Sequence, residues 1–285
     1  MKARIRRARF FEKVMKAVTG GAALLIIATA FALLGYLVYR GAPSITWEFL
    51  TAVPRKFMTQ GGIWPAILGT LLLTFWTAVF ALPVGVLAGV YLSEYAKRGL
   101  RTRLIRLSIA NMAGVPSIVY GLFGYALFVI ALKFKVSILS GSLTLACLTL
   151  PVIITATEEA LRQVPSDLRQ ASLALGASRW RTTYKVILPA AAPGVVTGSI
   201  LGLSRAAGET APIMFTAAFF SAPPASSVLD KTMALPYHIY IMATQPVRPA
   251  PAVVWGSALV LVAGISIINI AAAAWRSRAR RKIRW

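Results

Sequence analysis

The chain has 285 residues, of which 58% are hydrophobic and 14% are charged. This composition leaves too little polar surface to cover a water-soluble globule of that length, so it excludes a soluble protein and predicts an integral membrane protein. The formal net charge of +23 would point to nucleic acid in a soluble protein, so the positions of the basic residues must decide.

Six long apolar runs follow one another along the chain. Each is long enough for the roughly 20 helical residues that a hydrocarbon core of about 30 Å requires. A transmembrane barrel would alternate apolar and polar residues, whereas these runs are continuous. The sequence therefore predicts an all-α, polytopic membrane protein with six transmembrane helices, in the runs 18–39, 57–93, 107–132, 136–157, about 186–229 and 249–275.

Residues 1–17 form a basic N-terminal segment before the first transmembrane helix at 18–39. The 22 residues of that helix exceed the apolar core of a signal peptide, so we expect it to remain as an anchor. Later runs contain prolines, which we expect to kink helices without ending them, because neighbouring helices can satisfy the carbonyl groups that proline frees. Examples are Pro83, Pro116 and Pro151.

The 31 Lys and Arg residues are distributed unevenly between the connections. Twenty-three lie in the N-terminal segment, the second and fourth connections and the C-terminal tail, and seven lie in the other connections. The positive-inside rule then predicts that both termini are cytoplasmic. Because the positive charge lies at the ends of the spans, we expect it to meet membrane lipids and not nucleic acid.

Cys147 and His238 are each the only residue of their type. A single cysteine rules out an internal disulfide, and an isolated histidine is expected to be structural, so we predict neither a metal site nor catalytic residues. A membrane enzyme is the weakest alternative. The only pair that it could use is His238 with Asp230.

The fourth connection, 158–192, has no spanning pattern, but its helix signals predict three short helices, capped by Thr157, Ser166 and Ser178. Gly176 is expected to stop the second helix. One face of that helix, at i, i+3, i+4 and i+7, carries Leu168, Ala171, Ser172 and Leu175. Such a small apolar face can seat in a cleft on a soluble partner. The alternative is a helix-turn-helix that merely lies on the membrane surface.

The fifth run is the only one interrupted by charge, at Arg205 and Glu209. If one helix runs from about 193 to 220, the 3.6-residue period places both on a single stripe with Gly194, Gly198, Gly202, Pro212 and Thr216. The glycines form two overlapping GxxxG patterns, which permit close helix packing. We therefore expect this stripe to face protein or a cavity.

Arg205 would then lie near the bilayer centre, where a charge costs roughly 2.5 to 3.5 kcal/mol on insertion scales. One interpretation is a static ion pair that locks two helices. In the other, Arg205 attracts an anion transiently while Glu209 holds the guanidinium in place.

Two parts of the sequence resemble a known family. The residues Gln170-Ala171-Ser172, Gly176 and Val186-Ile187-Leu188-Pro189 resemble the cytoplasmic EAA motif of bacterial ABC importer permeases, although Gln170 replaces the usual Glu. Residues 198–218, above all AGETAP at 207–212, are similar to the fifth helix of the PstA-type permeases of phosphate-specific ABC importers. Residues 113–124 and 149–165 are also similar to that family, and together these segments cover about 60–220.

The resemblance implies the fold of a type I ABC importer permease. Its core, 60–220, would contain transmembrane helices two to five and a cytoplasmic coupling loop at 158–192. A proline-rich outer loop, 221–251, would precede the last transmembrane helix and basic cytoplasmic tail at 252–285. The residues that would couple to the ATPase subunit are Gln170, Ala171, Ser172, Leu175 and Gly176, and those that would line the translocation pathway are Arg205, Glu209 and Thr210.

The implied partners are a homologous second permease that forms a heterodimer with this chain, two copies of an ATP-binding subunit and an external phosphate-binding protein, all at a bacterial cytoplasmic (inner) membrane. No GxxxxGK[ST] loop occurs in the chain, so ATP and Mg would be bound by the partner subunit and this chain would hold no cofactor. A permease for sulfate or molybdate is one alternative. A gradient-driven secondary transporter or channel is another, but it leaves the 35 residues of 158–192 unexplained.

Overall fold

The computed structural model describes residues 2–56, 58, 60–97, 99–244 and 251–282. Helices are the only extended secondary structure among the described residues, which also include turns and two isolated bridges, Arg55 with Gln60 and Ala218 with Thr232. The α-helices are α1 (Lys2–Gly41), α2 (Trp47–Thr51), α3 (Trp64–Val90), α4 (Leu100–Ala113), α5 (Ser117–Gly124), α6 (Ile138–Arg162), α7 (Ser166–Ala174), α8 (Arg179–Thr182), α9 (Leu188–Ala207), α10 (Ala211–Thr216), α11 (Leu235–Thr244) and α12 (Pro251–Lys282).

Five of the described helical stretches are long and apolar enough to cross a membrane: Phe11–Ser44, Trp64–Tyr95, Ile138–Arg162, Arg179–Ala207 and Pro251–Arg278. The pair α4 and α5, with the π-helix Tyr125–Ala131 that extends α5, passes the same test together. The described part of the chain therefore has five candidate spans, or six if this bent pair is one span. This confirms the predicted all-α membrane fold.

The third predicted span, 107–132, is wrong as a single kinked helix. α4 ends at Ala113 and α5 begins at Ser117, and the two helices are bent by 101° at the break. The backbone N–H of Gly114 turns back to the carbonyl of Asn111, and Pro116 has no N–H with which to continue a helix. The chain therefore changes direction here, which hydropathy alone does not reveal.

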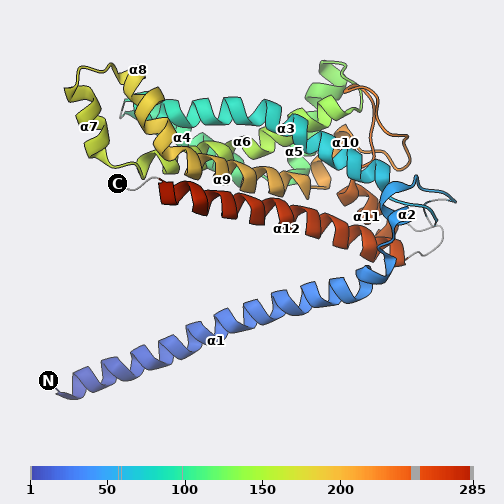
Figure 1. Ribbon diagram of the computed structural model, residues 1–285, viewed down its shortest axis with the longest axis horizontal. Coiled ribbons are helices and arrows are strands. Elements are labelled where there is room, and N and C mark those ends of the chain that lie inside the picture. Colours follow the sequence, from blue (N-terminus) through green and yellow to red (C-terminus); the bar gives the residue numbers. More distant parts are fainter. Residues whose placement is uncertain (1, 57, 59, 98, 245–250, 283–285) are drawn as a thin grey trace.

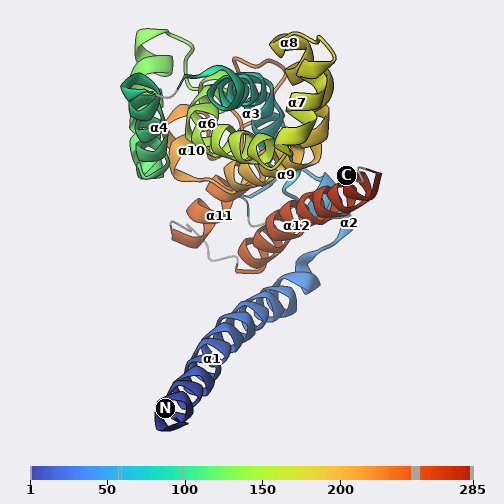
Figure 2. The same cartoon turned by 90° about the vertical axis from the view of Figure 1, so that its left-hand side faces the viewer.

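α6 lies at the centre of the bundle, between α3 and α9 (Figure 2). The approach of α3 depends on two glycines. A Cβ atom added at Gly85 would lie 2.6 Å from Cγ2 of Ile153, and one at Gly89 would lie 2.6 Å from Cβ of Thr157. Ile153 and Thr157 are fully buried. α3 and α6 are therefore packed too closely to rotate independently.

The two short helices that follow breaks in their runs pack against each other. A Cβ atom added at Gly121 of α5 would lie 2.9 Å from the carbonyl oxygen of Ala211 and 3.1 Å from Cα of Pro212, both in α10. α5 and α10 also contact α6. The third and fifth runs thus contact each other through the helices that follow their breaks.

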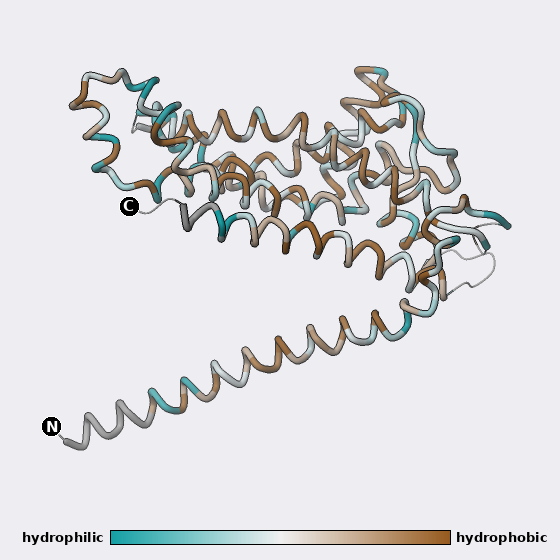
Figure 3. Tube along the Cα trace, viewed as in Figure 1, coloured by the Kyte–Doolittle hydropathy of each residue, from teal (hydrophilic) through white to brown (hydrophobic). Residues whose placement is uncertain are grey.

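α1 projects away from the other helices (Figure 1). No residue of its most apolar 18-residue window is buried, and its contact with α12 includes an edge-to-face pair of Tyr36 and Trp255 with ring centroids 5.4 Å apart. The start of α1 and the end of α12 lie at the same end of the molecule as α7 and α8, and α2 and α11 lie at the other. Figure 3 shows apolar residues along much of α1 and α12.

The outer loop predicted at 221–251 contains one helix, α11, and its residues 245–250 lie outside the described part of the chain. Both ring nitrogens of His238 are buried without a hydrogen-bond partner, and burial lowers the pKa of this side chain to about 4. Hydrogen bonds from Ser227 and Ser226 hold the pKa of Asp230 below its usual value. His238 and Asp230 are therefore not paired, which removes the only catalytic pair that the enzyme alternative could use.

Candidate functional site

The fifth run is broken where its two charges lie. α9 ends at Ala207, and the backbone N–H groups of Gly208 and Glu209 close a turn onto the carbonyls of Arg205 and Ala206 at 3.1 Å each. α10 then begins at Ala211, with Pro212 in its first turn. The predicted continuous helix from 193 to 220 is therefore wrong, because glycine and proline interrupt it.

This break changes the predicted stripe. The helical period holds only within α9, so the placement of Glu209, Pro212 and Thr216 on the glycine stripe is also wrong. Arg205 lies in the last turn of α9 and not in the middle of a long helix. The charge of Arg205 is thus at a helix end, beside backbone N–H and C=O groups that lack regular helical hydrogen bonds because the helix is broken there.

The ion pair between Arg205 and Glu209 is long, and its two side chains differ in exposure. Arg205 Nε lies 3.4 Å from Glu209 Oε1, and the side chain of Arg205 is 62% exposed whereas that of Glu209 is 17% exposed. The pair joins the last turn of α9 to the turn that follows it, so within this chain it does not lock two helices together. The guanidinium is accessible on the surface of the single chain.

Glu209 and Thr210 lie on the inner side of this break. Glu209 lines a small cavity together with two threonines of α3, Thr70 and Thr74. Thr210 is half-buried at the start of α10, and its carbonyl accepts a hydrogen bond from Met214 N at 3.1 Å. The break thus brings the exposed guanidinium of Arg205 close to a carboxylate beside α3.

The three predicted packing glycines lie between α9 and α6. A Cβ atom added at Gly194 would lie 2.8 Å from Cβ of Ala160, and one at Gly198 would overlap Cβ of Ala156. Gly202 is looser, at 3.4 Å from Cγ1 of Val152. The small residues on both helices allow their backbones to approach closely.

The connection before α9 differs in part from the three helices expected there. α6 continues through Thr157 to Arg162, so the first predicted short helix is wrong. α7 begins at Ser166, but Pro165 occupies its N-cap position and no side chain caps it. Ser178 caps α8 as predicted, with its hydroxyl accepting from Arg181 N at 3.3 Å. A π-helix, Thr183–Ile187, leads into α9.

The five predicted coupling residues differ in exposure and contacts. Gln170 and Ala171 are exposed, and the hydroxyl of Ser172 lies 2.9 Å from that of Thr182 in α8. Leu175 follows the end of α7 and is 89% exposed. Gly176 adopts φ +78°, the left-handed conformation of a helix stop.

The tip formed by α7, α8 and the turn between them exposes large apolar groups to its surroundings. Leu173, Leu175, Trp180 and Tyr184 are all exposed, and the last two rings are nearly parallel, with centroids 6.2 Å apart. Trp180 and Tyr184 lie at the start of the candidate span Arg179–Ala207, and an exposed apolar cluster at the end of a span marks an interaction surface. The aromatic pair was not predicted, although its i, i+4 spacing is visible in the sequence.

Two carboxylates at the same end of the bundle hold further ion pairs that the sequence did not predict. Glu94 pairs with Arg169, and Glu158 pairs with Arg106, each at 2.8 Å. These pairs join segments far apart in the chain, so no local pattern reveals them. The sequence does offer one indication of their importance. The chain has only 8 acidic residues, and these two lie at the ends of apolar runs.

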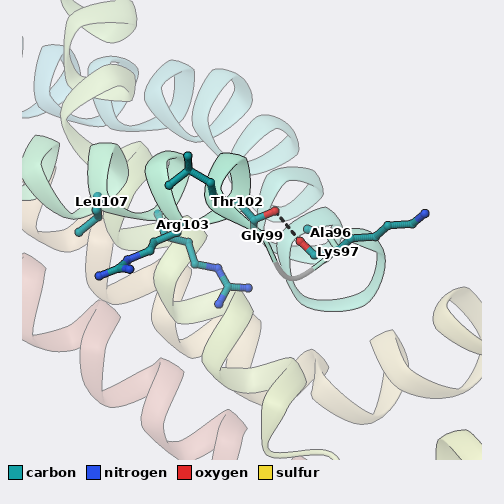
Figure 4. A pocket seen from close by; sticks show the side chains of 8 residues that line it. Ala96, Lys97, Gly99, Thr102, Arg103 and Leu107 are labelled. Atoms are coloured by element: carbon teal, nitrogen blue, oxygen red, sulfur yellow. Dashed lines mark hydrogen bonds between the residues drawn. The ribbon is translucent and has the colours of Figure 1, made fainter.

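A basic pocket lies where α4 begins (Figure 4). Lys97, Arg103 and Arg106 line it together with Leu107, and Thr102 Oγ1 donates to the Lys97 carbonyl at 2.7 Å. This combination of cationic and apolar groups suits the boundary between headgroups and acyl chains.

Comparisons with known proteins agree with this geometry. A family model described as "Binding-protein-dependent transport system inner membrane component" matches residues 81–284. The probable ABC transporter permease protein YqgI of Bacillus subtilis is 34% identical over 274 residues, which cover 92% of this chain and 93% of the relative. The phosphate transport system permease protein PstA 1 of Mycobacterium tuberculosis is 38% identical over 232 residues, 81% of this chain and 74% of the relative.

Among solved structures, a chain of a bacterial ABC transporter involved in the import of the acidic polysaccharide alginate is similar, with a TM-score of 0.61. The match covers 95% of this chain and 99% of that chain at 15% identity. At this identity the likeness concerns the fold alone.

Proposed function

The chain belongs to the family of binding-protein-dependent transport system inner membrane components, and on that basis we propose that it is the permease subunit of an ATP-driven importer of inorganic phosphate. It is a transport subunit of a multi-pass membrane assembly and not itself an enzyme. The family implies a separate ATPase and a substrate-binding protein as partners.

The observation that carries the phosphate assignment is the likeness to PstA-type permeases over most of the chain. The chemistry of the broken fifth run supports it. Arg205 presents a guanidinium that can donate bidentate hydrogen bonds to an oxyanion, and the weak pair with Glu209 orients it without blocking it. Helix breaks of this kind also serve as ion sites in other membrane transporters.

The pathway would lie between this chain and a homologous second permease. Arg205 is exposed in the single chain, and a heterodimer would enclose it in a protein-lined passage together with Glu209 and Thr210. Because the pair lies beside α3, a small movement of the spans can expose it alternately to the two sides. Such alternating access needs an energy source outside this chain.

The exposed tip of α7 and α8 would connect this chain to the ATP-binding subunit that supplies the energy. Leu175, Trp180 and Tyr184 would seat in a cleft of one ATP-binding subunit, and the two copies of that subunit would bind ATP and Mg in the complex. The tip would face the cytoplasm together with both termini. The opposite end, with α2 and α11, would receive the external phosphate-binding protein.

Membrane lipids are the remaining partner. The basic pocket at the start of α4 would lie at the cytoplasmic surface, where anionic headgroups attract Lys and Arg. This placement accounts for the excess of positive charge without nucleic acid.

Reconstitution tests the transport proposal. The chain, its second permease, the ATP-binding subunit and the binding protein would be placed in liposomes, with radiolabelled phosphate outside and ATP within. We expect ATP-dependent phosphate uptake that excess sulfate or molybdate does not compete away. Uptake of sulfate or molybdate in place of phosphate would refute the substrate, and uptake without ATP would favour a gradient-driven carrier.

Gly176→Val is expected to loosen the tip and to lower the phosphate transported per ATP hydrolysed. A branched residue in the left-handed conformation costs roughly 1–2 kcal/mol or more, which raises hydrogen exchange in α7 by about 5- to 30-fold. No atom lies within 4 Å of the added Cβ, so the effect is conformational.

Gly99→Val is the matched control, because its Cβ also meets open space but its φ of 176° is available to any residue. Hydrogen–deuterium exchange and coupled transport assays measure both variants. Equal exchange in α7 for the two variants would contradict the expectation.

A further inference from the structure

One guanidinium joins α7 to the end of α3. Arg169 donates from Nε and Nη2 to the two carboxylate oxygens of Glu94, at 3.3 and 2.8 Å. Glu94 belongs to the π-helix Tyr91–Tyr95 that extends α3. The result is a bidentate ion pair, a geometry that a lysine ammonium does not reproduce.

The same side chain holds the end of α6. Nη1 of Arg169 donates to the Val164 carbonyl at 2.8 Å, and Nη2 donates to the Leu161 carbonyl at 2.7 Å. Leu161 is in the last turn of α6 and Val164 lies just beyond it, at the negative end of the helix dipole, and the Leu161 carbonyl also accepts from Val164 N at 3.3 Å. Four hydrogen bonds from one side chain therefore connect three segments.

This connection is partly shielded from solvent. The side chain of Arg169 is 25% exposed and that of Glu94 is 12% exposed. α7 itself buries no residue, and its Leu168 is only partly buried against the core at the end of α6. A partly desolvated, charge-assisted contact is stronger than a surface ion pair. Arg169 is thus the principal polar tie between α7 and the spans.

From this geometry we infer that Arg169 is a positioning residue, which passes the displacement of α7 to α3 and α6 as one unit. The inference rests on the proposed function, because an ATP-binding subunit must move α7. Trp64–Tyr95 is one continuous stretch, with Glu94 at one end and Thr70 and Thr74 towards the other. Those threonines line the cavity that contains Glu209. A pull on Glu94 therefore reaches the translocation site without crossing a loop.

Arg169→Gln in the reconstituted complex tests the inference. Glutamine cannot hold Glu94 bidentately, so α7 would move without carrying α3. Coupling between distant sites is typically worth about 5- to 150-fold, and we expect about a tenfold fall in phosphate transported per ATP hydrolysed. The ATP-binding subunit should still co-purify, with basal hydrolysis retained. Arg169→Lys keeps the charge and should restore part of the ratio.

Three further variants distinguish the effect of losing the Arg169–Glu94 ion pair from the effect of a general loss of structure. Arg162→Gln is the matched control, because Arg162 is an exposed arginine at the end of α6 whose partner Glu158 also pairs with Arg106. Its ratio should stay within about twofold of wild type. Glu94→Gln should lose part of the ratio, because Arg169 keeps its hydrogen bonds to the α6 carbonyls, and adding Glu94→Gln to Arg169→Gln should cause little further loss, because the ion pair is already absent.

An unchanged ratio of phosphate to ATP in Arg169→Gln would overturn the inference. If that variant loses the ATP-binding subunit, Glu94→Gln decides, because it leaves α7 untouched, and an unchanged ratio there also overturns it. Absence of phosphate uptake by the wild-type complex would instead refute the proposed function.

Discussion

Arg205→Gln is expected to abolish phosphate uptake while the complex still assembles. The substitution removes the exposed positive charge at the break between α9 and α10, together with the donors that would meet the anion. Folding should be nearly unaffected, because the exposed pair with Glu209 contributes only about 0.2 to 1 kcal/mol. Uptake of radiolabelled phosphate and co-purification of the partner subunits measure the two effects separately.

The matched control for this substitution is Leu201→Gln. Leu201 lies one turn earlier in α9, is also exposed, and would present the same polar side chain without removing a charge. It should retain most of the uptake. Arg205→Lys should be intermediate, because the ammonium attracts an anion but cannot bind it bidentately. Near-normal uptake by Arg205→Gln would refute a role in the pathway.

Gly198→Leu is expected to prevent α9 from packing on α6, so that little folded protein accumulates. Even a Cβ atom at this position would overlap Ala156, and both atoms belong to long helices that cannot yield locally. Overpacking of a close-packed core typically costs about 1–3 kcal/mol, and separating two helix backbones costs more. Fluorescence-detected size exclusion and the apparent melting temperature would report the loss.

Two comparisons make this expectation specific to the α6–α9 contact. Gly21→Leu places the same side chain on α1, where no atom lies within 4 Å, and should be tolerated. Gly198→Ala should itself destabilise by about 1–3 kcal/mol, because its Cβ already overlaps Ala156, and combining it with Ala156→Gly should restore stability because the methyl group is only moved to the other helix. Wild-type stability of Gly198→Leu would contradict the packing described here.

The sequence predicts the parts of the fold that depend on local composition. Run length predicts the spans, because it measures the same apolar stretch that a bilayer requires. Gly176 and Ser178 predict the turn between α7 and α8, because a left-handed stop and an N-cap are single-residue effects. These features need no knowledge of the neighbouring helices.

Backbone direction and long-range pairing are not local and were not predicted. Hydropathy does not reveal the turns at 114–116 and 208–210. Two runs that were predicted as single helices are therefore each divided into two helices. The helical period then misplaced Glu209. The ion pair between Arg169 and Glu94 joins positions 75 residues apart, and no sequence periodicity predicts it.

The contact between α5 and α10 has a mechanical consequence. The chain enters both helices through non-helical joints, and Gly121 packs closely against Ala211 and Pro212, so a movement of either helix at its hinge would carry the other with it. Arg205 and Glu209 flank one of those hinges. A rotation at this hinge would change the direction of the Arg205 side chain more than its position, so the proposed pathway could alternate without carrying the charge across the membrane.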